Sequence, residues 1–370
     1  MTHAVELEGV TKKFGNLAAV NNASFNIERG EFFCLIGPSG SGKTTTLRLL
    51  AGLVQPDSGR ILIHGVDYTN VPTFKRPISM VFQTWALFPH LTVFDNVAFG
   101  LRMRNAPKQT IQEEVRKTLE LVRMSEYAMR KPRELSGGQQ QRVGIARALV
   151  VKPDIILLDE PLGNLDFKLQ LQLQEELSQM HRQLRITFVY VTHDQRQAMA
   201  LGERVCVMNN GNIEQLDETA KVYSKPRNVF VARFVGESNI IKGIVKSSDG
   251  GKTTVETALG SFLFDGGSFT REQGVWLFWR PENTLIASES AGGDYTFEGV
   301  VNAVETSGQV TQYVVDVGGI PIRVVKTGLP DPEIGEKAKV EVGVKGERML
   351  LLDTLSTSET GRVEEALLGA

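Results

Sequence analysis

The sequence predicts an α/β domain followed by an all-β domain, and two observations support this division. Up to residue 236, continuous apolar runs of strand length alternate with stretches of helical periodicity, which indicates a sheet covered by helices on both faces. Between residues 240 and 353, short alternating runs punctuated by glycine are typical of a small OB-like barrel. A chain of 370 residues is also too long for one ordinary core. We place the domains at 1–236 and 237–355, and we expect residues 356–370 to be a disordered tail.

The composition excludes several classes of protein. With 41 Lys and Arg against 43 Asp and Glu, the net charge of -2 gives no overall field that would attract nucleic acid or anionic lipid. No apolar stretch approaches the roughly 20 residues of a membrane-spanning helix, and the first residues lack the apolar core of a signal peptide, so we expect a cytosolic chain. Cys34 and Cys206 are too few for a disulfide framework or a zinc site, and we expect both to be buried, reduced thiols.

The chain begins with two strand-like runs, residues 5–10 and 23–27, which we expect to pair in a small antiparallel sheet. The turn at 14–16 carries Phe14. An aromatic face at this turn can stack on a purine, an interaction worth about 1–3 kcal/mol per base. An isolated aromatic residue is more often part of the core, so both interpretations stay open at this point.

Residues 37–45 form the motif G-x-x-x-x-G-K-[ST] between an apolar strand at 32–36 and a helix that continues through 46–51. The glycines allow successive backbone N–H groups to surround a β-phosphate, and the helix N-terminus adds a partial positive charge. Lys43 is placed to reach the β- and γ-phosphate oxygens, and Thr44 to offer its hydroxyl to Mg²⁺. A glycine-rich turn without a ligand is the alternative, which the flanking strand and helix disfavour. The sequence therefore predicts that the chain binds a nucleoside triphosphate.

A further buried strand, residues 78–82, ends at Gln83 and is followed by the irregular apolar stretch Thr84–Val93. If this stretch is exposed it is a docking patch for a partner, and if it is buried it is only a connection. Residues 94–130 are predicted to form helices, and the segment 112–122 is clearly amphipathic. We therefore expect a helical subdomain at about 88–150.

Residues 135–142 open another helix, which continues to 149. Ser136 is a good N-cap, and Gly137 and Gly138 leave the N–H groups of the first turn uncovered, so this tip is a second candidate anion site. The chain contains a single phosphate loop, so this tip has no nucleotide of its own. A symmetric dimer in which each tip covers the nucleotide of the other subunit would use both.

Two more apolar strands end in polar residues. The run 155–160 ends in Asp159 and Glu160, and the run 187–191 leads to His193. Open α/β sheets bind ligands at the carboxyl edge of their strands. We therefore expect these side chains at the same edge as the phosphate loop.

The order of these motifs, together with the run Asn164-Leu165-Asp166, resembles that of the ATP-binding-cassette (ABC) ATPases over residues 4–235. The resemblance implies a RecA-like P-loop fold with a helical subdomain. In the all-β part, two predicted strands begin with a similar sequence, at residues 241–245 and 297–301. This part also contains the motif Trp279-Arg280-Pro281-Glu282. With these features it is similar to the TOBE-type regulatory domain of solute-importer ATPases.

Within that family, the chain looks most like the spermidine and putrescine (polyamine) import ATPases. The similarity rests on the segments 82–83, 86–90, 96–101 and 234–239. Importers of ferric iron and of sugars share much of this pattern and stay open as alternatives.

The resemblance implies ATP and Mg²⁺ as cofactors. Phe14 is expected to stack on adenine, although Tyr is the commoner residue there. The phosphates are expected on the loop residues Ser39, Gly40, Ser41, Gly42, Lys43, Thr44 and Thr45. The nucleotide of the other subunit is expected to be covered by Ser136, Gly137, Gly138 and Gln139.

Mg²⁺ is expected on Thr44 and Gln83, with Asp159 holding it through water. Glu160 is expected to polarise the attacking water and His193 to contact the γ-phosphate, so that these two and Gln83 form the catalytic set. An Asp that faces the metal should stay ionised, which leaves its neighbour free to act as the base. One departure is Gly163, where relatives usually carry Ser or Thr, and it puts one hydrogen bond between subunits in doubt.

The sequence thus predicts a peripheral ATPase subunit of a binding-protein-dependent importer, at the cytoplasmic face of the inner membrane. Two copies are expected to sandwich two Mg-ATP and to move transmembrane permease subunits that dock near Thr84–Val93, while a periplasmic or extracellular solute-binding protein acts indirectly. The slightly negative charge and the lack of a long coiled-coil insertion disfavour a soluble cassette ATPase acting on nucleic acid or ribosomes. A nucleotide switch without hydrolysis is opposed by the intact Glu160 and His193.

Overall fold

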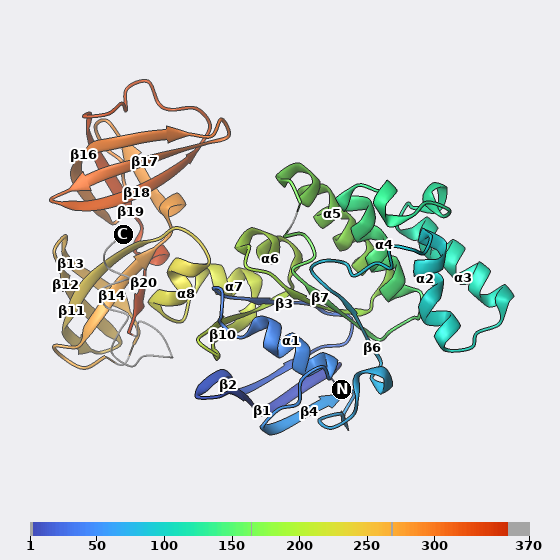
Figure 1. The fold of residues 1–370 in the computed structure, drawn as a ribbon. Coiled ribbons are helices and arrows are strands. Elements are labelled where there is room, and N and C mark those ends of the chain that lie inside the picture. Colours follow the sequence, from blue (N-terminus) through green and yellow to red (C-terminus); the bar gives the residue numbers. More distant parts are fainter. Residues whose placement is uncertain (1–2, 164, 268, 354–370) are drawn as a thin grey trace. The chain divides into compact units, whose positions relative to one another are not determined.

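The computed structural model describes residues 3–163, 165–267 and 269–353. The chain folds into two compact units, the first ending at Ala220 and the second beginning at Lys221 (Figure 1). The tail expected at 356–370 and Asn164 of the motif run lie outside the described residues.

The first unit contains two sheets. A four-stranded antiparallel sheet has the order β2-β1-β4-β5, with bounds Leu17–Ile27, Val5–Phe14, Ser58–Ile63 and Val66–Asp67. A six-stranded sheet has the order β10-β9-β3-β8-β7-β6, with bounds Asn212–Glu218, Arg204–Asn209, Phe32–Ile36, Thr187–Val191, Ile155–Asp159 and Ile78–Val81. The expected antiparallel pair at the start of the chain is confirmed as β1 and β2, with longer strands than the sequence indicated.

The first four helices of the chain lie in segments predicted as helical, and the later helices of the first unit were not predicted from the sequence (Figure 1). Their bounds are α1 Lys43–Ala51, α2 Val93–Met103, α3 Lys108–Leu121, α4 Gly137–Leu149, α5 Phe167–Leu184 and α6 Gln195–Leu201. Helix α7, Thr219–Ser224, spans the residues at which the chain divides into the two units. Short 3₁₀ turns lie at Thr73–Lys75, Ser125–Tyr127 and Pro132–Glu134. Side chains cap four of these helices. Thr92, Ser136, Asp166 and Asp194 accept from N–H groups in the first turns of α2, α4, α5 and α6.

The centre of the six-stranded sheet is buried on both faces. Every residue of β3, β7 and β8 is buried, as a parallel sheet covered on both sides requires. In the parallel register Leu35 and Asp159 both lie opposite Val191, so these three strands end at the same level. The residues that follow each strand therefore emerge at one edge.

Cys34 and Cys206 lie on the neighbouring strands β3 and β9 and are both free and buried, as expected. The register pairs Cys34 with Val205, and Cys206 with Leu35. Side chains alternate between the faces of a sheet, so the two thiols point to opposite faces. A disulfide between them is excluded by this geometry.

The second unit is built from two five-stranded antiparallel sheets around one shared core. The first has the order β13-β12-β11-β14-β20, with bounds Gly260–Asp265, Lys252–Thr257, Asn239–Asp249, Gly274–Trp279 and Leu350–Leu352. The second has the order β15-β19-β16-β17-β18, with bounds Thr284–Ala287, Lys339–Val344, Tyr295–Thr306, Val310–Val317 and Ile320–Thr327. Residues of both sheets, including Phe262, Trp279 and Tyr313, fill the core between them. Helix α8, Val229–Phe234, precedes the sheets, and 3₁₀ turns lie at Pro281–Asn283 and Gly346–Arg348.

The two similar strand starts, at residues 241–245 and 297–301, lie in the central strands of the two sheets. β11 and β16 each occupy the centre of a sheet, and each carries a glycine at the same point of the repeat. A Cβ at Gly243 would lie 2.5 Å from a methyl of Val255, and one at Gly299 would lie 2.6 Å from a methyl of Val315. Both strands also shift register two residues after the glycine. The two sheets are therefore equivalent structures, and glycine lets a valine of the neighbouring strand cross each central strand closely.

Arg280 of the Trp279–Glu282 motif fastens α8 to the sheets. Its guanidinium is buried and donates to the carbonyl oxygens of Tyr223 at 2.8 Å, Ala232 at 2.9 Å and Gly236 at 3.0 Å. It also lies 4.1 Å from the centroid of the Tyr223 ring. Burial lowers the pKa of Arg280, and the nearby Tyr223 and Glu282 oppose the shift. The motif is thus explained by packing within this unit.

We expect Arg280→Met to destabilise the second unit by about 3 kcal/mol or more, because several buried carbonyl groups lose a charged donor at once. Urea unfolding followed by the fluorescence of Trp276 and Trp279 measures this effect. Arg271→Met is the matched control, since the Arg271 side chain is 81% exposed. Equal midpoints for Arg280→Met and the parent chain would contradict this account of the motif.

Candidate nucleotide-binding site

The phosphate loop connects β3 to α1 through glycines in conformations that other residues rarely adopt. Gly40 has φ 79° and Gly42, the N-cap of α1, has φ 105°. A Cβ at Gly42 would also collide with the carbonyl oxygen of Ala19. The sequence motif is therefore required by the backbone itself at these positions.

Lys43 is buried at the start of α1 and closes the loop. Its Nζ donates to the carbonyl oxygens of Gly37 and Pro38, both at 2.8 Å, and lies 3.4 Å from Ser41 Oγ. Burial lowers the pKa of Lys43, and the charges of Glu160 and Asp159 raise it. The ammonium group is thus fixed beside the loop, with carboxylates close enough to stabilise its charge.

Thr44 and Asp159 form a set of oxygen donors next to this lysine. The Thr44 hydroxyl donates to Asp159 Oδ1 at 3.3 Å. Burial raises the pKa of Asp159, while the Thr44 hydrogen bond and the charge of Arg48 lower it. A carboxylate that is costly to bury, beside a hydroxyl, fits a Mg²⁺ ion that takes its remaining ligands from phosphate and water.

Glu160 lies just beyond the end of β7 in a left-handed conformation, with φ 45°. Its N–H donates to the Val191 carbonyl at 3.0 Å, which continues the hydrogen-bond ladder with β8 by one residue. A non-glycine residue in this region costs on the order of 1–3 kcal/mol and is found mainly at functional sites. The strand ladder therefore holds Glu160 in a strained position.

Three of the residues predicted as catalytic meet at this carboxylate. His193 Nδ1 lies 3.1 Å from Glu160 Oε1, and Gln83 Nε2 lies 3.4 Å from Glu160 Oε2. They follow β8, β7 and β6, three adjacent strands of the sheet. The sequence separated these residues by up to 110 positions, and the parallel register brings them together.

The helix tip at Ser136 has a complete capping box. Gln139 N donates to Ser136 Oγ at 3.4 Å, and Ser136 N donates to Gln139 Oε1 at 2.9 Å. A Cβ at Gly138 would lie 2.9 Å from a methyl of Leu169 on α5, and one at Gly137 would lie 3.2 Å from a methyl of Leu165. The glycines of this tip are therefore needed for close packing as well as for bare N–H groups.

Phe14 is not a core residue, because 54% of it is exposed at the end of β1. The Lys12 ammonium lies 5.7 Å from the centroid of its ring. An exposed aromatic face beside a cation is compatible with a base-stacking platform. The core interpretation of Phe14 is wrong.

The stretch Thr84–Val93 is neither fully exposed nor fully buried. Phe88 packs against Phe99, with ring centroids 4.6 Å apart, and its N–H donates to Oδ1 of the buried Asn96 at 2.8 Å. Pro89 and His90 are exposed, as is Phe82 just before the stretch. The stretch is therefore a rigid connection that leaves part of its surface open.

Two supporting residues were missed by the sequence analysis. Buried Gln197 accepts from the Tyr190 hydroxyl at 2.7 Å and donates to Asp194 at 3.4 Å, which braces the turn that carries His193. Half-buried Arg147 contacts the turn after Gln83. The only signal for either was a polar side chain on the apolar face of a helix.

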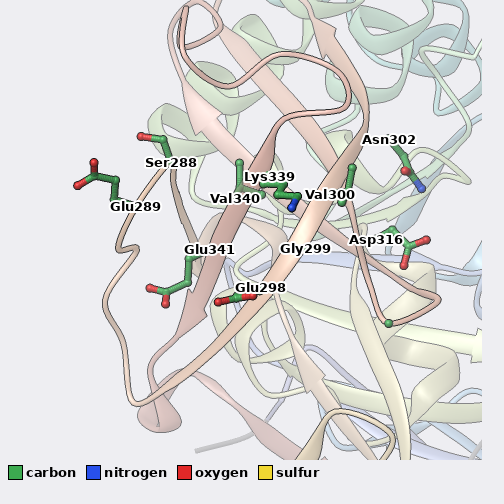
Figure 2. Close-up of a pocket in the computed structure, with 11 residues that line it drawn as sticks. Ser288, Glu289, Glu298, Gly299, Val300, Asn302, Asp316, Lys339, Val340 and Glu341 are labelled. Atoms are coloured by element: carbon green, nitrogen blue, oxygen red, sulfur yellow. The ribbon is translucent and has the colours of Figure 1, made fainter.

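A hollow in the second unit contains none of the predicted site residues. It has a volume of about 530 Å³ and is lined mainly by β16, β17 and β19 (Figure 2). Four carboxylates line it, namely Glu289, Glu298, Asp316 and Glu341, together with Lys339. Glu298 and Glu341 are direct partners across β16 and β19, an arrangement of like charges that disfavours pairing.

No helix in the described ranges is long and apolar enough to cross a membrane.

Comparison with known proteins gives a consistent result. The family described as "ABC transporter" matches residues 20–163, and the family described as "TOBE domain" matches residues 278–352. The chain is 45% identical to the spermidine/putrescine import ATP-binding protein PotA of Rubrobacter xylanophilus, over 84% of this chain and 83% of the relative. The protein of that name from Chromobacterium violaceum is 47% identical, over 85% of this chain and 88% of the relative.

Two solved structures share the fold of the first unit. One is the dimeric structure of MJ0796, a bacterial ABC transporter cassette, which is 34% identical with a TM-score of 0.53 and covers 58% of this chain and 98% of its own. The other is cbiO1 from Clostridium perfringens, part of the ABC transporter complex cbiONQ. It is 27% identical with a TM-score of 0.57 and covers 61% of this chain and 92% of its own.

The fold and the site together define an ATP-binding-cassette ATPase with a C-terminal TOBE domain. The chain belongs to the ABC transporter family, in the group of import ATP-binding proteins that contains the two curated relatives.

The geometry at Gly163 predicts that a side chain is tolerated there. A Cβ would lie 3.5 Å from the Glu160 carbonyl oxygen and 3.6 Å from its Oε2, which are ordinary contacts, and its φ is not positive. We expect Gly163→Ser to change the free energy of unfolding by less than about 0.5 kcal/mol. Gly42→Ala should cost about 1 kcal/mol or more, because of its φ and its collision with Ala19. Urea unfolding of both variants tests the contrast, and equal losses would contradict it.

Proposed function

We propose that this chain is the ATP-hydrolysing subunit of an importer of polyamines of the spermidine and putrescine type. The observation that carries the proposal is the meeting of Gln83, Glu160 and His193 beside a complete phosphate loop. The names of the curated relatives support the substrate class. Ferric iron and sugars are the alternative substrates.

In this proposal the nucleotide binds along the carboxyl edge of the six-stranded sheet. Phe14 stacks on adenine, and the backbone of Ser39–Thr45 surrounds the phosphates. Lys43 exchanges a loop carbonyl for phosphate oxygens. Mg²⁺ is held by Thr44, Gln83 and, through water, Asp159, and when bound it neutralises charge on the phosphates.

Glu160 acts as the general base. It takes a proton from the water whose oxygen attacks the γ-phosphorus, while the bond from that phosphorus to the ADP oxygen breaks. His193 and Gln83 hold the carboxylate from either side, at 3.1 Å and 3.4 Å. His193 also contacts the γ-phosphate. Because the three side chains lie within two residues of strand ends, little reorganisation is needed as charge develops.

MJ0796, a bacterial ABC transporter cassette, is dimeric in its solved structure. For this chain we propose a homodimer in which Ser136, Gly137, Gly138 and Gln139 of one copy close over the ATP of the other. The single phosphate loop and the bare helix tip support this arrangement.

The remaining assignments concern partners and domains. We propose that permease subunits dock near Thr84–Val93, where the exposed Pro89 and His90 lie on a rigid connection. The chain would then work at the cytoplasmic face of the membrane, with a solute-binding protein acting indirectly and no nucleic acid. The ATPase domain is proposed as 1–236, with a helical subdomain at about 88–150, and the regulatory domain as 237–355.

Glu160→Gln keeps the size and hydrogen bonds of the side chain but removes the proton acceptor. We expect ATP turnover to fall by roughly 10²-fold or more, with ATP binding retained. Phosphate release and equilibrium nucleotide binding are the measurements, and wild-type turnover in this variant would sink the assignment.

The substrate is tested in cells that lack the native gene. Uptake of labelled putrescine and spermidine should return with the parent chain and not with Glu160→Gln. Restored uptake of ferric iron or a sugar, with no polyamine uptake, would support the alternatives instead.

The dimer is tested by mixing two inactive variants. Ser136→Arg places bulk on the helix tip, and Lys43→Ala removes the loop cation. Their mixed dimer has one site with both defects and one with neither, so ATPase activity should partly recover. Ser136→Arg also removes a helix cap worth about 1 kcal/mol, so its melting temperature is measured alone. Mixtures that never exceed either variant would rule out shared sites.

A further inference from the structure

The turn after Gln83 is held in an unusual backbone conformation. Trp85 has φ 56° and Ala86 has φ 45°, so two consecutive non-glycine residues lie in the left-handed region. For a bulky residue such as Trp this is a true outlier. Such a conformation persists only where the surroundings over-determine it.

Arg147, on the last turn of α4, binds both strained residues. Its Nη2 donates to the Trp85 carbonyl at 2.8 Å, and its Nη1 donates to the Ala86 carbonyl at 2.7 Å. The guanidinium carbon lies 5.6 Å from the centroid of the Phe88 ring. The planar fork of arginine donates to two adjacent carbonyl oxygens from separate nitrogen atoms in a fixed geometry.

The Trp85 side chain lies along the same helix. A Cβ at Gly144 would be 3.4 Å from Trp85 Cβ, and one at Gly137 would be 3.5 Å from the far edge of the indole. The indole Nε1 is buried and has no hydrogen-bond partner in the described part of the chain. Packing on two helix glycines and the bonds from Arg147 are therefore what hold Trp85 in place.

Trp85 in turn closes the turn that contains Gln83. Its backbone N–H donates to the Phe82 carbonyl at 2.9 Å. On the other side, β6 ends at Val81, which is fixed opposite Leu158 of β7. One end of the turn is thus set by the sheet and the other by α4. The Gln83 amide, between them, reaches Glu160.

We propose that Arg147 is a positioning residue for Gln83, acting by clamping the strained turn at Trp85 and Ala86 to α4. The inference rests on the proposed role of Gln83 beside Glu160 and Mg²⁺. It adds a physical link between the two sites of the dimer, because the helix that presents Ser136 to one nucleotide also fixes Gln83 at the other. A movement of α4 on closing would shift both.

A double-mutant cycle tests the proposal on the full-length protein. Arg147→Met should lower kcat by about tenfold and raise the Mg²⁺ concentration for half-maximal activity several-fold. Binding of nucleotide without metal should change by less than about twofold. In the Gln83→Ala background, adding Arg147→Met should change neither quantity by more than about twofold, because the residue it positions is gone.

A second readout does not depend on activity. Arg147→Met should make Trp85 more accessible to acrylamide quenching, and the increase should vanish when Trp85→Phe is added. Arg142→Met is the matched control. Arg142 lies on the same helix but donates to Glu176 at 2.7 Å and not to the turn. Its effect on kcat should therefore add to that of Gln83→Ala, and its quenching should match the parent.

Each outcome bears on a separate claim. If the losses from Arg147→Met and Gln83→Ala add, the positioning role is wrong while the role of Gln83 stands. If Gln83→Ala alone changes neither kcat nor the Mg²⁺ requirement, the proposed role of Gln83 and this inference both fail. If Arg147→Met does not fold, Arg147→Lys, which keeps the charge but loses the planar fork, enters the same cycle, and additive losses there overturn the proposal.

Discussion

The site depends on the parallel register of β7 and β8, in which the last residues of the two strands lie opposite each other. Asp159 lies opposite Val191, and the Glu160 N–H donates to the Val191 carbonyl oxygen at 3.0 Å. The chain then leaves the strand through the left-handed conformation of Glu160. Because both strands are buried and bonded along their length, the carboxylate and His193 meet without a flexible segment between them. A site fixed in this way needs little rearrangement during phosphoryl transfer.

Three buried or half-buried arginines fix parts of the chain that no strand hydrogen bonds hold. Arg76 donates to the Leu49 and Leu50 carbonyls at the end of α1, Arg147 to the turn after Gln83, and Arg280 to the end of α8. Burial lowers the pKa of all three guanidinium groups. Each one satisfies carbonyl groups that a helix end or turn leaves without partners, and desolvation is offset by several short hydrogen bonds.

Burial disfavours the charged forms of both Asp159 and Lys43, and so it shifts their pKa values in opposite directions. Desolvation raises the pKa of Asp159 and lowers that of Lys43, while each charge stabilises the other. Neither group can lose its partner without cost, since an unpaired buried charge is strongly unfavourable. A bound triphosphate with its metal enters a site where this opposition already exists, and it can take over the role of either partner.

The sequence by itself determined the α/β and all-β division, the phosphate loop and the family, because motifs such as Gly37–Thr45 encode local backbone geometry. It also placed Asp159, Glu160 and His193 at strand ends, since continuous apolar runs mark buried parallel strands. Only the tertiary structure decided that Phe14 is exposed, that the repeat at Gly243 and Gly299 marks the centres of two sheets, and that Arg147 and Arg280 bind main-chain carbonyls. The physical reason is that these contacts join residues far apart in the chain. In addition, every residue has a backbone carbonyl group, so the residue type does not show which carbonyl accepts a hydrogen bond from an arginine.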